Sequence, residues 1–162
     1  MDDKKTTISD IRHHLRTLMR ELDVVKGIFL GTGFTYAQCH LMFELSQHSS
    51  INPLPLAKKL LLDKSNLSRM VKRLVELGMI RSKQSKIDQR QKELSLTAKG
   101  KSLIDRINKV SNSQVSDALE QLSAEQQETV VQGLSLYADA LRKIRLKSEA
   151  DFQAIEQKRN SK

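Results

Sequence analysis

Apolar residues recur at steps of three and four over residues 8–30, which predicts one long amphipathic helix. The sequence Gly31-Thr32-Gly33 is expected to stop it. A second helix is predicted from Thr35, as its N-cap, to about His48. The side chains expected to face a core in this second helix are Leu41, Met42 and Leu45.

Two shorter helices follow a predicted turn at residues 49–53. Pro55 can occupy the first turn of a third helix that ends near Leu62. A fourth helix is predicted from about Lys64 to Leu77, with Asp63 or Ser65 as its cap and Gly78 at its end. Its core face would consist of Leu67, Met70, Val71 and Leu74.

Apolar and polar residues alternate over 79–84 and 92–96, which predicts two short antiparallel strands joined by a polar loop. Helical periodicity returns from Ala98, with a fresh N-cap at Ser123 and a last helix to about Leu146. The polar residues 147–162 are expected to form a frayed tail. A helix pair followed by a hairpin predicts a mainly α fold with a β-hairpin wing, the winged helix-turn-helix that reads DNA.

The charge of the chain sharpens this interpretation. The formal net charge is +9, which on its own allows nucleic acid, an acidic protein or a membrane surface as partner. Residues 63–101 contain eleven basic and four acidic residues, so this segment carries +7 of the +9. Positive charge concentrated on the winged segment indicates double-stranded DNA as the partner.

The polar face of the predicted fourth helix is the candidate for the major groove. Short side chains at its beginning can approach base edges, Arg69 can make a two-pronged contact with guanine, and the cations after it lie where phosphates would pass. The alternative is an ordinary solvated face. The predicted DNA-binding residues here are Ser65, Asn66, Ser68, Arg69, Lys72 and Arg73.

The tip of the predicted hairpin carries Asp88 and Arg90, two residues apart. An exposed ion pair between them would stabilise the tip by only ~0–1 kcal/mol, so a DNA target is the better reason for the arginine. A guanidinium at a wing tip fits a narrow minor groove. Lys83, Lys86 and Lys92 would add phosphate contacts, whereas the alternative for the tip is an incidental surface salt bridge.

Two segments, 56–80 and "DQRQKELSLTAKG" (88–100), resemble the MarR family of bacterial transcriptional regulators. The family's wing signature, Asp-x-Arg and then Leu-Thr before a helix, is matched by Asp88, Arg90, Leu96 and Thr97. The resemblance implies a homodimer with the wing arginine in the minor groove and the fourth helix in the major groove. It also implies a small-molecule effector pocket, which residues near Phe34, Tyr36, Cys39 and Phe43 could line, although core packing is the alternative for each.

Residues 112–141 look like the end of the regulator half of MarR–acetyltransferase fusion proteins, but the chain stops about twenty residues later, too soon for an acetyltransferase domain, so we expect either a stand-alone relative or a truncated chain. Over residues 1–146 we expect one MarR-like domain. Within it, 34–97 form the DNA-binding region. Segments 1–33 and 98–146 supply dimerisation helices, because their apolar stripes are longer than one winged domain can cover. A twofold dimer implies a near-palindromic operator.

The remaining chemistry-bearing residues narrow the class of protein. Cys39 is the single cysteine, so no intramolecular disulfide forms, and we expect a small, half-buried apolar residue there; a redox switch is the alternative. The four histidines show no zinc-ligand spacing with Cys39, so neither a metal nor a cofactor is expected. Without a signal peptide or an apolar membrane span, a cytoplasmic location is expected.

The sequence was weighed against three classes of function: a regulator, another kind of DNA-binding protein and an enzyme. A sequence-specific dimeric regulator is the leading hypothesis. A DNA-binding adaptor that recruits a partner protein through residues 147–162, or a non-specific DNA-binding protein, is the alternative. An enzyme is not expected, since the sequence shows no catalytic triad, phosphate loop or suitable carboxylate pair.

Overall fold

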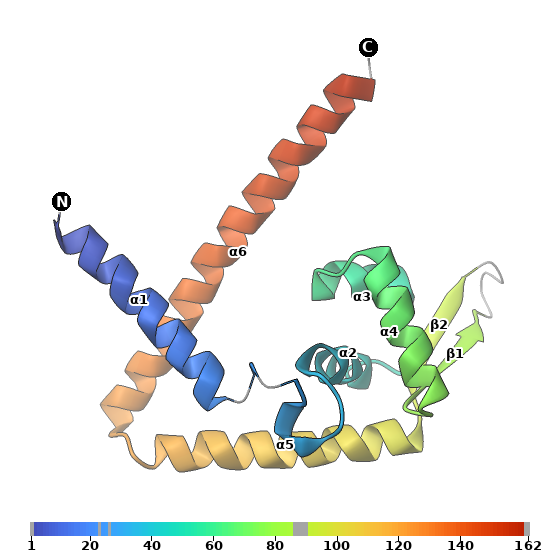
Figure 1. Ribbon diagram of the computed structural model, residues 1–162, viewed down its shortest axis with the longest axis horizontal. Helices are drawn as coiled ribbons and strands as arrows, with labels where there is room; N and C mark the ends of the chain where they lie inside the picture. Colours follow the sequence, from blue (N-terminus) through green and yellow to red (C-terminus); the bar gives the residue numbers. More distant parts are fainter. Residues whose placement is uncertain (1, 23, 26, 86–90, 161–162) are drawn as a thin grey trace. The chain divides into compact units, whose positions relative to one another are not determined.

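The structure, a computed structural model, describes residues 2–22, 24–25, 27–85 and 91–160 (Figure 1). The chain forms two compact units, residues 1–112 and 113–162, and helix α5 crosses the boundary. The elements, in order, are α1 (Asp2–Glu21), η1 (Phe29–Gly31), α2 (Tyr36–Ser46), α3 (Pro53–Leu60), α4 (Lys64–Glu76), β1 (Ile80–Gln84), β2 (Lys92–Leu96), α5 (Ala98–Leu119) and α6 (Ala124–Asn160). The mainly α fold with a β-hairpin wing is thus confirmed.

The first helix ends earlier than predicted. α1 stops at Glu21, whereas the apolar spacing extends to Phe29. The intervening sequence contains a β-branched pair, Val24-Val25, and Gly27, all weak helix formers. Beyond it the chain turns through η1, where the Thr32 hydroxyl donates to the Phe29 carbonyl at 2.7 Å.

Helix α2 begins as predicted and forms the centre of the core. The Thr35 hydroxyl accepts from the Gln38 N–H at 3.3 Å, and the Gln38 side chain accepts from the Thr35 N–H at 2.9 Å, so the helix starts with a capping box. The three side chains predicted to face inward, Leu41, Met42 and Leu45, are all almost fully buried.

Helices α3 and α4 form the helix-turn-helix. The Asn52 side chain caps α3, which begins at Pro53, so Pro55 lies in its first turn as predicted. It ends at Leu60 because Leu61 adopts a left-handed conformation, φ 55°, two residues before the Asp63 cap of α4. On α4, Leu67 and Leu74 are buried while Met70 and Val71 pack against the core, as the spacing predicted.

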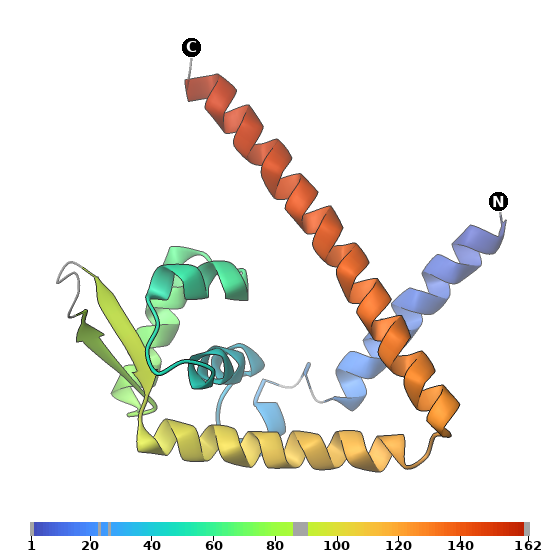
Figure 2. The same cartoon turned by 180° about the vertical axis from the view of Figure 1, so that it is seen from behind.

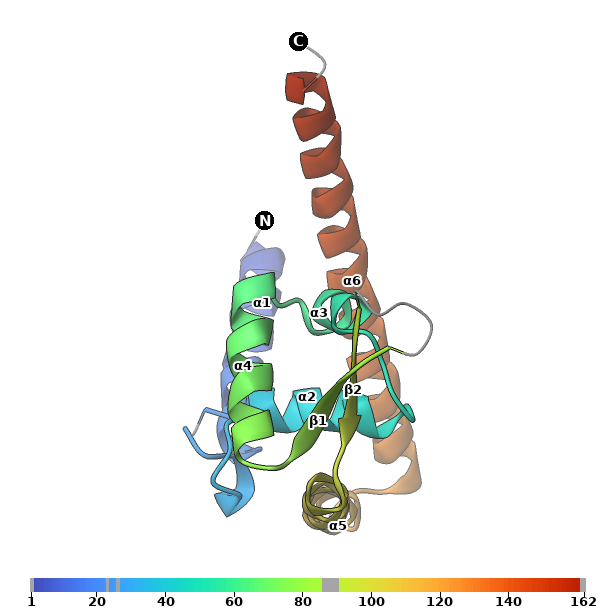
Figure 3. The same ribbon diagram turned by 90° about the vertical axis from the view of Figure 1, so that its right-hand side faces the viewer.

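The hairpin stands beside α4, with β1 in contact with that helix (Figure 2, Figure 3). Strand β1 pairs antiparallel with β2, from Ile80 opposite Leu96 to Gln84 opposite Lys92. The backbone of Ile51 bridges to Leu94 with hydrogen bonds of 3.0 and 2.9 Å, which ties the segment before α3 to the wing. The base of the wing is therefore held by the core.

A corner after β2 joins the hairpin to α5. The Thr97 hydroxyl donates to the Gly78 carbonyl at 2.7 Å and accepts from the Gly100 N–H at 3.1 Å, while the Thr97 N–H donates to the Met79 carbonyl at 3.0 Å. Gly100 lies so close to Met79 that a Cβ would stand 2.1 Å from its carbonyl oxygen. A side chain at position 100 therefore has no room.

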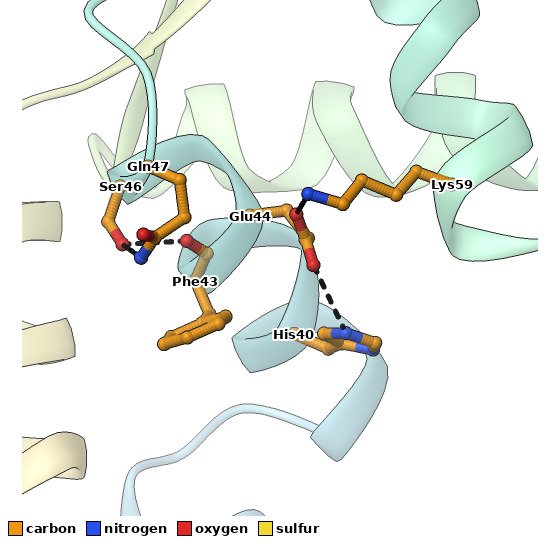
Figure 4. Close-up of polar contacts among 6 residues, drawn as sticks. All are labelled: His40, Phe43, Glu44, Ser46, Gln47 and Lys59. Carbon is orange, nitrogen blue, oxygen red and sulfur yellow. Dashed lines mark hydrogen bonds and ion pairs between the residues drawn. The ribbon is translucent and has the colours of Figure 1, made fainter. Parts of the chain in front are cut away.

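A buried carboxylate links α2 to α3. Glu44, with 11% of its side chain exposed, forms an ion pair with Lys59 of α3, and its other oxygen lies 3.7 Å from Nε2 of His40 (Figure 4). The Lys59 side chain is about half exposed, so the ion pair joins a partly hydrated ammonium to a largely buried carboxylate.

Replacing Lys59 with methionine is expected to lower the free energy of unfolding by about 1–3 kcal/mol, because a buried carboxylate loses its main partner. Urea unfolding at pH 7 and fixed protein concentration measures this. Lys58→Met, on the same helix and exposed, is the matched control and should be nearly neutral. Equal losses in the two variants would show that the Glu44–Lys59 pair does not stabilise the helix-turn-helix.

The last helix is longer than predicted. α6 continues to Asn160, so the segment expected to be a frayed tail is helical. Its polar sequence is rich in Glu, Gln, Lys, Arg and Ala, residues that favour helices without any need for a buried face. Across the described residues, none of the helices has a stretch that is long and apolar enough to cross a membrane.

Candidate nucleic-acid interface

The exposed face of α4 carries all the residues predicted to meet the major groove. Ser65, Asn66, Ser68, Arg69, Lys72 and Arg73 are exposed, opposite the buried Leu67 and Leu74. Because α4 is strongly amphipathic, these six side chains follow from the same periodicity that buries its core face. Arg73 also pairs loosely with Glu76, at 3.8 Å, in an exposed contact.

A hydrogen-bonded chain orders the first turns of this face. Asp63 accepts from the Asn66 backbone N–H at 2.8 Å and from its side-chain amide. The carbonyl oxygen of the same Asn66 side chain accepts from Nη2 of Arg69 at 2.5 Å. The sequence predicted Asp63 only as a cap. The spacing of Asp63, Asn66 and Arg69 at i, i+3 and i+6 places the three side chains on one face of the helix, so their hydrogen bonds could have been predicted from it.

The donors around Asp63 lower the pKa of its carboxyl. The Asn66 backbone N–H is the main cause, and the Asn66 amide and the Arg69 guanidinium act in the same direction. Since the pKa is lower in the folded protein, this cap stabilises the fold above the ordinary pKa of an aspartate and loses that effect as the pH falls through the lowered value.

A mostly apolar cavity of about 640 Å³ lies between α4 and the hairpin. Val71 and Val75 of α4 and Leu94 of β2 line it, and Lys72 of α4 and Lys92 of β2 are also among its lining residues. These two lysines come from the two elements expected to contact DNA, so the structure places basic groups on both sides of the cavity.

The wing is only partly described. Lys83 is exposed on β1, opposite Glu93, which accepts from the hydroxyls of Ser50 and Ser85 at 3.0 and 2.8 Å. Three of the predicted wing residues, Lys86, Asp88 and Arg90, lie outside the described residues. The predicted ion pair at the tip and the minor-groove role of Arg90 remain predictions.

The predicted effector residues do not all meet. Tyr36, Cys39 and Phe43 line a cavity of about 290 Å³, together with Phe29, His40, Ile107, Asn108 and Ser111. Phe34 is not among the lining residues and packs in the core, which was the alternative for each of the four residues. The α5 residues of this cavity were not predicted, since nothing in the local pattern shows that the face of α5 around residue 107 approaches α2.

Cys39 is a core residue rather than a half-exposed one. Only 3% of it is exposed, and its sulfur lies 3.8 Å from the Thr32 hydroxyl. Burial raises the pKa of the Cys39 thiol, and the hydrogen bond with Thr32 opposes that shift. The raised pKa keeps the thiol protonated and unreactive at neutral pH.

We expect the native protein to react with a thiol-specific reagent at pH 7–8 at least about tenfold more slowly than the unfolded chain, because the thiol is both buried and protonated. A time course of colour release with and without denaturant measures the two rates. Equal rates would indicate an accessible thiolate and would bring back the redox alternative for Cys39.

The titratable side chains form no metal centre in the part of the chain that the structure describes, where no group of three or more His, Cys, Asp or Glu residues converges.

Comparisons with known proteins agree with this geometry. Residues 34–92 match the MarR family model, and no curated protein matches the chain significantly. A MarR mutant from E. coli in complex with operator DNA is similar, with a TM-score of 0.64, 20% identity, and coverage of 83% of this chain and 96% of that chain. So is a mutant MepR from S. aureus, with a TM-score of 0.65, 19% identity, and coverage of 85% and 97%.

A third similar structure is Bordetella bronchiseptica BpsR, whose DNA binding is regulated by 6-hydroxynicotinic acid. Its TM-score is 0.63 at 16% identity, over 80% of this chain and 98% of that chain. At these identities the structural likenesses establish the fold.

Proposed function

Because residues 34–92 match the MarR family model, we propose that the protein is a sequence-specific DNA-binding transcriptional regulator without enzymatic activity. The observation that carries the proposal is the exposed face of α4. It presents short polar side chains and the ordered Arg69 beside a hairpin that carries further cations. In this proposal α4 enters the major groove and the wing reaches the minor groove.

Within the proposal, Arg69 reads a guanine, while Ser65 and Ser68 approach base edges or phosphates. Asn66 positions Arg69, since both ends of its side-chain amide already have partners within the helix. Lys72, Arg73 and Lys83 are exposed and contact phosphates.

Homodimerisation is supported by apolar side chains that are exposed in the single chain. α1 exposes Ile8, Ile11, Leu18 and Met19, and α6 exposes Val131, Leu134, Leu141 and Ile144. Exposed apolar surface on this scale is typical of an interface. A twofold dimer would present two copies of α4 to successive major grooves of a near-palindromic operator.

A small effector is the proposed regulator, and the cavity lined by Tyr36, Cys39 and Phe43 is its proposed site. Regulation of BpsR by 6-hydroxynicotinic acid supports a small ligand as the class of effector. Such a ligand acts only if it binds differently to dimers with different spacing between the two α4 helices.

Selection from sheared genomic DNA tests the proposal. The purified protein is incubated with the fragments, and the bound fragments are sequenced. Enrichment of one near-palindrome by the native protein, and its loss with Arg69→Ala, is the expected result, because a two-pronged arginine contact is worth about 1–3 kcal/mol of discrimination.

Arg106→Ala, an exposed arginine on α5 away from α4, is the matched control and should leave the enrichment unchanged. Uniform recovery of all fragments by the native protein would contradict sequence specificity. It would favour the non-specific or adaptor alternative.

A further inference from the structure

A second polar surface lies away from α4. A cavity of about 400 Å³ is enclosed by the end of α2, the base of the hairpin and the start of α5. Its lining includes the buried Leu45 and the polar residues His48, Ser49, Arg81, Ser95 and Lys101. The DNA interface described above uses none of these residues.

Two cations line this cavity, Arg81, opposite Ser95 in the hairpin, and Lys101 of α5. Both are exposed, and within the described ranges no hydrogen bond or ion pair engages either side chain. The acid of β2, Glu93, instead accepts from Ser50 and Ser85. Two basic side chains therefore line a polar cavity that lacks an acidic lining residue.

The C-terminal end of α2 disfavours the binding of an anion in this cavity, because a helix C-terminus carries about half a negative charge. The N–H groups of Gln47 and His48 return to the carbonyls of Glu44 and Leu45 and partly satisfy that end. Two full positive charges outweigh the remainder, so the local potential favours an anion.

We propose that this cavity binds a phosphate group. The planar fork of Arg81 matches two phosphate oxygens, and Lys101 adds a point charge. Ser49 and Ser95 supply hydroxyl donors at the same cavity. Either a small phosphorylated molecule or the backbone of bound DNA can bring this group, and the phosphate chemistry is the same in both cases.

Pyrophosphate titration of the full-length protein, without DNA, tests whether a small phosphorylated molecule can bind in the cavity. Amide chemical shifts should change at residues 46–49, 81 and 95. Arg81→Ala/Lys101→Ala should weaken binding at least about tenfold, since charge-assisted hydrogen bonds are lost. Arg106→Ala/Lys109→Ala removes the same charge from exposed positions on α5 and should have no effect.

The salt dependence of DNA binding tests the second source. If the duplex backbone occupies the cavity, the same double variant reduces the slope of log affinity against log salt by about one for each lost contact. Either positive result supports the phosphate site and names its source. The proposal is overturned if pyrophosphate does not bind and the slope is unchanged, or if both double variants have equal effects.

Discussion

Raising the salt concentration from 50 to 200 mM is expected to weaken operator binding by about 10³–10⁵-fold. The expectation follows from the exposed cations on α4 and the hairpin, Lys64, Arg69, Lys72, Arg73, Lys83 and Lys92. If about three to five of them contact phosphates in each protomer, a dimer makes about 6–10 such contacts, and each releases a bound counterion. Fluorescence anisotropy of a labelled operator at several salt concentrations measures the slope.

The same measurement on Lys72→Gln separates this explanation from a general effect of ionic strength on folding. Removing one phosphate contact per protomer should lower the slope by about two in the dimer. Lys109→Gln, on α5, should leave it unchanged. A slope near zero for the native protein would mean that phosphates contribute little to binding, contrary to the proposed function.

Replacing Gly100 with alanine is expected to destabilise the fold by about 3 kcal/mol, at the upper end of the range for overpacking. The new Cβ would stand 2.1 Å from the Met79 carbonyl oxygen and 3.1 Å from the Leu96 side chain. The carbonyl cannot move freely, because it accepts from the Thr97 N–H at 3.0 Å. Thermal unfolding at fixed protein concentration measures the loss.

Gly133→Ala is the matched control, since Gly133 also lies within a helix but a Cβ at that position would meet no described neighbour within 4 Å. That substitution should stabilise the protein by about 0.5–1 kcal/mol, as expected for an open helical site. Similar stability changes at the two glycines would show that the corner between the hairpin and α5 relaxes at little cost.

The elements predicted correctly from the sequence are those with local signals. Thr35 and Asp63 are side-chain caps, Gly78 has φ 69° at the end of α4, and the alternating residues of the hairpin form its strands. In each case the deciding interactions lie within a few residues along the chain. The early end of α1 shows the limit of periodicity as a signal. The apolar spacing continues past Glu21, but the residues that follow favour a helix too weakly to extend it.

The residues of the candidate site likewise fall into those that a local pattern predicts and those that depend on packing between distant elements. The exposed face of α4 follows from periodicity within one helix, so the sequence was sufficient to predict its members. The cavity beside Tyr36 and the cavity beside Arg81 each depend on contributions from α5, and local pattern carries no information on that packing. Phe34 packs in the core, the alternative that the sequence left open, because an aromatic ring next to a helix cap can face either the core or a cavity.

The chain of hydrogen bonds from Asp63 through Asn66 to Arg69 has a thermodynamic consequence. A free arginine side chain loses about 1.5–2 kcal/mol of rotamer entropy when it is fixed. Arg69 is already restrained in the protein without DNA, so part of that loss occurs during folding and not during binding. If the protein reads DNA as proposed, its sequence preference then depends on Asp63, a residue that need not touch a base. Selection could then alter that preference by changing how tightly Arg69 is restrained.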